Sequence, residues 1–89
     1  MLLASAPNPF RTGAAIRFVT PTAGNVSIRV FDAGGRLLRR LDDRVAAGPH
    51  EVRWDGKDEQ GRAAPSGILF YEVVANGTRR TGRMVRLGS

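Results

Sequence analysis

The sequence contains no cysteine and one histidine, and only one of its 14 lysine and arginine residues is a lysine. The absence of cysteine excludes disulfides and thiolate-ligated zinc. No apolar run approaches the roughly 20 residues that a membrane-spanning helix needs. The apolar start, Met1–Ala4, is too short for a signal peptide and has no basic residues before it, so no secretory signal is expected there.

The scarcity of histidine and cysteine also argues against catalysis. A catalytic triad or a metal site needs a set of positioned partners, and none surrounds His50 in the sequence. We therefore expect His50 to be a structural or surface residue. The sequence predicts a protein that is not an enzyme and has no cofactor.

What is present is typical of one folded domain. The chain has 89 residues, of which 42% are hydrophobic and 25% are charged. Disordered chains combine low hydrophobicity with high charge, so this composition argues against disorder. We expect a short N-terminal arm or the remnant of a linker over residues 1–5, and a single domain over residues 6–89.

Alternation of apolar and polar residues predicts a chain made of strands. In the clearest case, Val26, Ile28 and Val30 point to one side of a strand, and Ser27 and Arg29 point to the other. No segment has a convincing helical pattern. The expected strands cover residues 14–20, 26–31, 36–41, 49–54, 68–75 and 78–87.

Glycine and proline separate these strands. Asn76-Gly77 is a strong signal for a tight hairpin, Asp32–Gly35 is expected to close another, and residues 42–48 are expected to form a loop. Short strands at this spacing predict an all-β fold, an antiparallel immunoglobulin-like β-sandwich of about seven strands.

The two ends of the chain carry further expectations. Pro7 and Pro9 forbid a helix, so residues 1–10 are expected to be extended, with Phe10 anchored in the core. The run 68–75 is apolar on both faces, which is typical of a central strand. In the last strand, Val85 and Leu87 are expected to face the core.

The stretch WDGKDEQGRAAPSGILFY, residues 54–71, has the most distinctive composition. Asp55, Asp58 and Glu59 could hold calcium, but their spacing differs from that of an EF-hand loop. Hydrogen bonds within Asx turns explain these acids more simply, and calcium stays open at this point. We predict that the fold depends chiefly on Pro7, Asn8, Pro9, Phe10, Gly35, Trp54, Asp55, Gly56, Gly61, Gly67 and Tyr71.

The net charge is +6, and almost all the basic residues are arginine. One interpretation is a general bias towards surface arginine; the other is a basic surface for an anionic partner such as a glycan. Nucleic acid is disfavoured, because the few aromatic residues lie in core-like runs and not on an exposed face. The candidate interaction residues are Arg79, Arg80, Arg83 and Arg86.

Four segments together suggest a family: PNPF at 7–10, VFDAGGRLLRRL at 30–41, AGPHEVRWDGKDEQGR at 47–62 and PSGILFYEV at 65–73. In this order and spacing they resemble the immunoglobulin-like domain of the flagellar hook-capping protein. The pattern is also similar to the C-terminal sorting domains of type IX secretion. The resemblance covers residues 6–87, and its most specific part begins at Trp54.

The resemblance implies a non-enzymatic sorting or cell-surface attachment module of an exported bacterial protein, with the secretion machinery as its partner. The position of TGRMVRL, residues 81–87, near the end of the sequence fits this expectation, although Arg83 stands where lysine is common. The alternative is a structural subunit of an extracellular or flagellum-associated fibre. In that case the arm Met1–Phe10 would add as a strand to the sheet edge of a neighbouring copy.

Overall fold

The computed structural model describes residues 3–5 and 9–88, with only the backbone described for residues 3–5. Met1, Pro7 and Asn8 lie outside this part, so the expectations for Pro7 and Asn8 stay predictions. Within the described ranges all regular structure is β-strand, and no helix there is long or apolar enough to cross a membrane.

The described residues form six strands of seven to nine residues and one strand of three. They are β1 (Leu3–Ser5), β2 (Ala14–Thr20), β3 (Gly24–Phe31), β4 (Leu37–Val45), β5 (Gly48–Trp54), β6 (Gly67–Ala75) and β7 (Thr78–Arg86).

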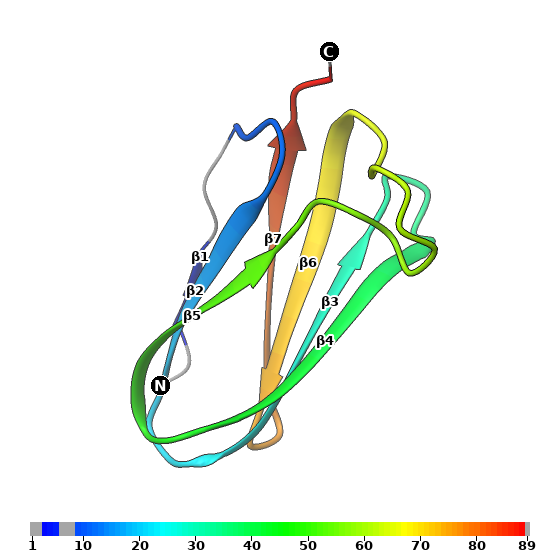
Figure 1. The fold of residues 1–89 in the computed structure, drawn as a ribbon. Coiled ribbons are helices and arrows are strands. Elements are labelled where there is room, and N and C mark those ends of the chain that lie inside the picture. Colours follow the sequence, from blue (N-terminus) through cyan, green and yellow to red (C-terminus); the bar gives the residue numbers. More distant parts are fainter. Residues whose placement is uncertain (1–2, 6–8, 89) are drawn as a thin grey trace.

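These strands form two antiparallel sheets that face each other (Figure 1). The first sheet has the order β1-β2-β5, and the second has the order β4-β3-β6-β7. The chain crosses between the sheets from β2 to β3, from β4 to β5 and from β5 to β6. The crossing from β4 to β5 is the green corner of Figure 1. The predicted all-β immunoglobulin-like sandwich of about seven strands is confirmed.

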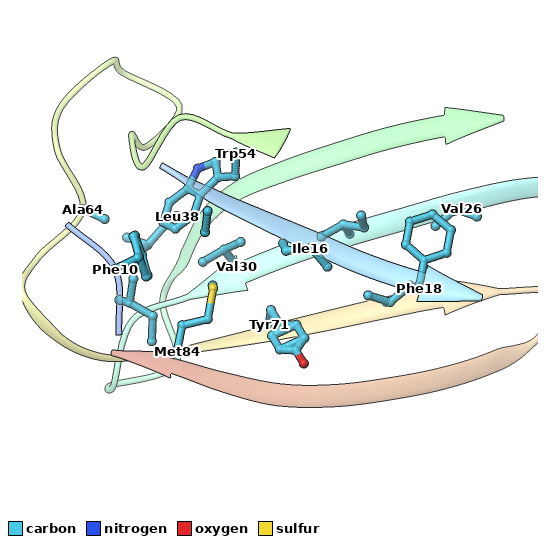
Figure 2. Close-up of a cluster of buried hydrophobic side chains, with 14 of the residues drawn as sticks. Phe10, Ile16, Phe18, Val26, Val30, Leu38, Trp54, Ala64, Tyr71 and Met84 are labelled. Carbon is cyan, nitrogen blue, oxygen red and sulfur yellow. The ribbon is translucent and has the colours of Figure 1, made fainter. Parts of the chain in front are cut away.

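The core fills the space between the two sheets (Figure 2). The inward positions of β2, β3 and β6 are apolar at every second residue, which is why these strands build the two facing walls. Trp54, Phe18 and Met84 are among the largest fully buried side chains. Phe10, anchored in this core as expected, is 7% exposed.

The register of β7 differs from the expectation. Leu69 faces the core from β6 and pairs with Met84, so Met84 is the inward residue of β7. Leu87 is instead 38% exposed, and Val85 points to the outer side of the sheet. The prediction that Val85 and Leu87 face the core was wrong, because the next inward position is Gly82, which gives no apolar signal.

β4 is longer than expected. Asp42 and Asp43, expected to lie in a loop, pair with Ser27 and Val26 of β3. The backbone pairing continues although the side chains are charged, because this edge of the sheet faces solvent. A register shift between Val30 and Phe31 marks a bulge where the end of β3 pairs with the start of β4.

The Asn76-Gly77 hairpin is confirmed. Both residues have positive φ angles, 52° and 76°, as a type I′ turn requires. The Asn76 side-chain amide also donates hydrogen bonds to the Thr22 carbonyl (3.4 Å) and to the hydroxyls of Thr20 and Thr22. These bonds tie the β6–β7 hairpin to the turn after β2 and so join the two sheets at this end.

Candidate functional site

The loop from Asp55 to Ser66 is the first candidate, since it holds the most distinctive part of the sequence. The carboxylates of Asp55 and Asp58 turn back onto the loop itself. Asp55 Oδ1 accepts a hydrogen bond from the Lys57 backbone N–H (3.0 Å), and Asp58 Oδ1 accepts from those of Gln60 (2.9 Å) and Arg62 (3.0 Å). These are Asx-turn bonds, which stabilise a reversal of the chain.

Asp58 is the buried acid of this loop, 6% exposed. The hydrogen bond from the Arg62 backbone N–H, helped by the Gln60 N–H and the Arg62 charge, lowers the pKa of Asp58 against the opposing effect of burial. Within residues 3–5 and 9–88, no group of three or more potential ligand side chains could hold a metal ion. Asp55 and Asp58 bind the backbone of their own loop.

The loop is fixed to the sandwich at both sides. On one side, the Glu59 backbone N–H donates to the Leu38 carbonyl (3.0 Å), and Glu59 Oε1 accepts from the Arg40 N–H (2.9 Å). Through these bonds the loop covers the start of the β4 edge, which would otherwise be open to strand addition. On the other side, a Cβ on Gly56 would lie 2.0 Å from the Thr12 carbonyl oxygen. Only glycine fits this contact.

Trp54 closes this end of the core (Figure 2). The residue is 2% exposed, and its ring meets the Phe10 ring edge-on, with 5.9 Å between centroids. Its Nε1–H donates to the Lys57 carbonyl (2.9 Å), which satisfies the buried polar atom of the indole. Gly35, Gly61 and Gly67 have positive φ angles of 89°, 81° and 106°, and each marks a point where the chain turns.

Tyr71 lies further along the core and packs over β7. It is 5% exposed, and burial raises the pKa of its hydroxyl. The ring lies directly above Gly82, where a Cβ would come within 2.4 Å of the hydroxyl oxygen. Gly82 therefore determines this packing. The sequence does not predict this role, because a lone glycine in a strand carries no motif.

The arginines predicted as an interaction cluster do not form one surface. Successive residues of a strand point to opposite faces. Arg79 and Arg83 lie on the outer face of the four-stranded sheet, whereas Arg80 and Arg86 are on the inward side of β7, with Arg80 exposed. Arg79 also forms an ion pair with Glu72 (3.3 Å). The four arginines are close together in the sequence, but the strand geometry places them on opposite faces of the sheet.

His50, the single histidine, is half-buried on the inward side of β5. Its ring lies 5.6 Å from the Phe18 ring, and its Nε2 lies 2.5 Å from the Ala46 carbonyl oxygen. These contacts fit a structural role, one of the two that the sequence left open for it.

The outer face of the four-stranded sheet is the feature that the sequence analysis overlooked. Three of the five large apolar side chains that are strongly exposed within the described residues lie here. They are Leu37 (45%), Ile68 (46%) and Phe70 (41%). Although β6 is central in its sheet, as predicted, its second apolar face is uncovered. An exposed apolar cluster of this kind is typical of an interaction site.

Glu72 gives this face a fixed charged centre. Its carboxylate accepts from Arg29 Nε (2.8 Å) and from Arg79 Nη1 (3.3 Å), and only 7% of its side chain is exposed. The two guanidinium groups cover the carboxylate. Arg29 also lies 5.6 Å above the Phe31 ring, so it links the charges to the apolar cluster.

Comparison with known proteins places the chain in a family. The model of the FlgD Ig-like domain matches residues 10–80. The basal-body rod modification protein FlgD of Salmonella typhimurium is 33% identical over 55 residues, which is 61% of this chain and 24% of that protein. The chain therefore spans about a quarter of the length of this relative.

Solved structures share the fold. All of this chain superposes on 9% of dimeric latent PorU from Porphyromonas gingivalis, with a TM-score of 0.80 and 22% identity. FlgD from P. aeruginosa matches 78% of this chain and 55% of its own length, with a TM-score of 0.66 and 27% identity. With the family match from Phe10 to Arg80 and the same sandwich in these structures, this chain belongs to the FlgD Ig-like domain family.

Proposed function

We propose that the chain is a non-catalytic protein-binding module that serves as a sorting or cell-surface attachment domain of an exported bacterial protein. One observation carries the proposal. The distinctive residues of the loop after Trp54 are used in holding the fold, whereas an apolar sheet face stays uncovered. A module built in this way acts through its surface and not through chemistry in a pocket.

Family membership supports the protein-binding part of the proposal. The sorting part rests on the resemblance of the segments from PNPF to PSGILFYEV to type IX sorting domains. The superposition of the whole chain on part of PorU agrees with it as a likeness of fold. An extracellular or cell-surface location follows from the same proposal.

Export of a reporter tests the sorting role. The full chain is fused to the C-terminus of a periplasmic reporter in a host that has type IX secretion, and the reporter is measured in the periplasm and at the cell surface. We expect it at the surface in the intact host and in the periplasm of a strain without the translocon. Retention in the periplasm of both strains would contradict the sorting role.

A matched fusion separates sorting from stability. Gly56→Ala disturbs the fold, because its Cβ would meet the Thr12 carbonyl, whereas Gly61→Ala has open space around it. We expect the Gly61→Ala fusion to be exported and the Gly56→Ala fusion to be retained. Equal export of both fusions would mean that the folded domain is not what the machinery recognises.

Strand exchange between copies is the second candidate function, favoured by the geometry of β1. Within the described part of the chain, this strand pairs with β2 over three residues, from Leu3↔Val19 to Ser5↔Arg17. In a fibre, β1 of one copy would pair with β2 of the next, a contact that does not close on itself. Light scattering of the full chain and of a chain without residues 1–5 tests this. Assembly that is lost with the deletion supports it, and two monomers contradict it.

A further inference from the structure

The uncovered sheet face has a defined arrangement. The register places Phe31 beside Phe70, and Phe70 beside Arg83; in the next row, Ile68 lies beside Val85. Leu37, opposite Phe31, extends the same surface to β4. We name this surface the outer apolar face; its residues are Phe31, Leu37, Ile68, Phe70 and Val85.

This face is a rigid platform, because β3 and β6 are hydrogen-bonded to neighbours on both sides. A partner that binds there therefore meets a surface that is already ordered, which reduces the entropic cost of association. A shallow hollow of about 240 Å³, lined by Phe70, Thr81, Gly82 and Arg83, opens at the β7 side of the face. It offers a place for a side chain of the partner.

The charges near the outer apolar face are mainly positive. Arg29 and Arg79 share the single carboxylate of Glu72. Arg83, which lines the hollow, has no carboxylate partner within residues 3–5 and 9–88. The whole chain carries a net charge of +6. A partner with acidic groups would therefore complement both the face and the domain.

We propose that the outer apolar face binds an acidic protein segment, whose apolar side chains cover Ile68 and Phe70 and whose carboxylate pairs with Arg83. The inference rests on the proposed function, since it names the partner chemistry of the same binding module. It replaces the predicted cluster of four C-terminal arginines by one arginine combined with an apolar surface.

Charge and composition favour this occupant over two others. A second copy of the chain would bring arginine against arginine, which costs free energy in a buried contact. An anionic glycan would pair with Arg83, but it would leave the aliphatic side chains of Leu37 and Ile68 without apolar partners. An acidic segment with apolar side chains complements both features at once.

Selection from a random peptide library tests the proposal. Phage that display random 12-residue peptides, about the length of a short recognition segment, are selected on the immobilised full chain. We expect enriched peptides to combine Asp or Glu with Leu, Ile, Val or Phe. Synthetic copies should bind with an affinity that falls as salt is added, because the pair with Arg83 is exposed to solvent.

Two pairs of variants locate the binding site. Ile68→Thr and Arg83→Glu should each weaken binding about tenfold or more, the loss of one anchoring contact. Val19→Thr is the apolar control, because Val19 is 38% exposed on the other sheet. Arg80→Glu is the charge control, because Arg80 lies on β7 but points to the opposite side. Both controls should bind as the unmodified chain does, and thermal unfolding verifies that all four variants fold.

The following results would contradict the proposal. These results are a library without enrichment, enrichment of basic peptides, or equal losses in the controls. Heparin binding that is lost with Arg83→Glu, without any peptide binding, would indicate a glycan site. A dimer in sedimentation that dissociates with Ile68→Thr would indicate a second copy. The experiment uses the purified chain, so its result is independent of the export test: failed binding with intact export leaves sorting in place.

Discussion

The loop after Trp54 and the outer apolar face differ in how they use their polar and apolar groups. In the loop, the carboxylates of Asp55 and Asp58 bind backbone N–H groups of the same loop. On the face, the apolar side chains of Ile68 and Phe70 are exposed to solvent. The conspicuous region is therefore structural, and the inconspicuous one is accessible. Motifs in small domains of this kind report first on the fold.

The largest expected effect on the free energy of unfolding comes from a substitution in the loop. Gly56→Ala places a Cβ 2.0 Å from the Thr12 carbonyl at a φ of +80°. Overpacking costs about 1–3 kcal/mol, and a left-handed backbone costs a non-glycine residue about 1–2 kcal/mol. We expect Gly56→Ala to lower the free energy of unfolding by about 3 kcal/mol or more, measured by urea denaturation.

Gly61→Ala is the matched control for Gly56→Ala. Its φ of +81° is nearly the same, but no atom lies within 4 Å of the added Cβ. Only the backbone term remains, so we expect a loss of about 1–2 kcal/mol. Equal losses for the two variants would show that the contact with Thr12 does not hold the loop to the sandwich.

The second expected effect lies beneath the outer apolar face. Gly82→Ala directs a Cβ into the Tyr71 ring, and we expect it to cost about 1–3 kcal/mol of unfolding free energy. Tyr71 is the only tyrosine, so an ultraviolet titration reports on it directly. Its raised pKa should fall towards the ordinary value in Gly82→Ala if the ring is displaced towards solvent. An unchanged titration and stability would show that the ring is not confined by Gly82.

The sequence predicted the sandwich because its strands alternate clearly. In β2 and β3 the inward positions Ile16, Phe18, Val26, Ile28 and Val30 are apolar at every second residue, and the glycines and Asn76-Gly77 mark the turns. It failed in β7, where Arg80, Gly82 and Arg86 occupy inward-side positions and only Met84 is apolar. A pattern-based assignment there follows Val85 and Leu87, one residue out of register.

The candidate site was harder to predict than the fold. The four residues Phe31, Leu37, Ile68 and Phe70 come from three strands, which meet only through the register of β4, β3 and β6. Their apolar character suggested burial, because a run such as Ile68–Ala75 has the same composition whether its second face is covered or bare. The two cases differ only in whether another layer of protein covers the second face. The local pattern of the sequence does not contain this information.

The third prediction concerns the outer apolar face itself. Phe70→Thr keeps a residue with high strand propensity and removes an apolar side chain that is 41% exposed. We expect the free energy of unfolding to change by less than about 1 kcal/mol, whereas binding of the acidic peptides is lost. A large loss of stability would mean that Phe70 serves the fold, and the contrast between loop and face would then fail.

The smallest expected effect is the contribution of the Asp58 charge in the loop to the free energy of unfolding, and it depends on pH. The pKa of Asp58 is lowered in the folded chain, chiefly by the Arg62 backbone N–H, so its charged form stabilises the fold. This contribution is present above the ordinary aspartate pKa of about 3.9, and it is lost as the pH falls through the lower folded pKa. Asp58→Asn keeps an oxygen for the two backbone bonds but removes the charge.

The difference in unfolding free energy between the original chain and Asp58→Asn isolates this charge from the other carboxylates, which titrate in both proteins. Urea denaturation from neutral pH downwards should show the original chain to be more stable above about pH 4, with the difference shrinking at lower pH. A difference that stays constant would mean that the Asp58 oxygens act only as neutral acceptors. The loop would then be held by its hydrogen-bond geometry alone, and its charge would be as dispensable for the fold as Phe70 is expected to be.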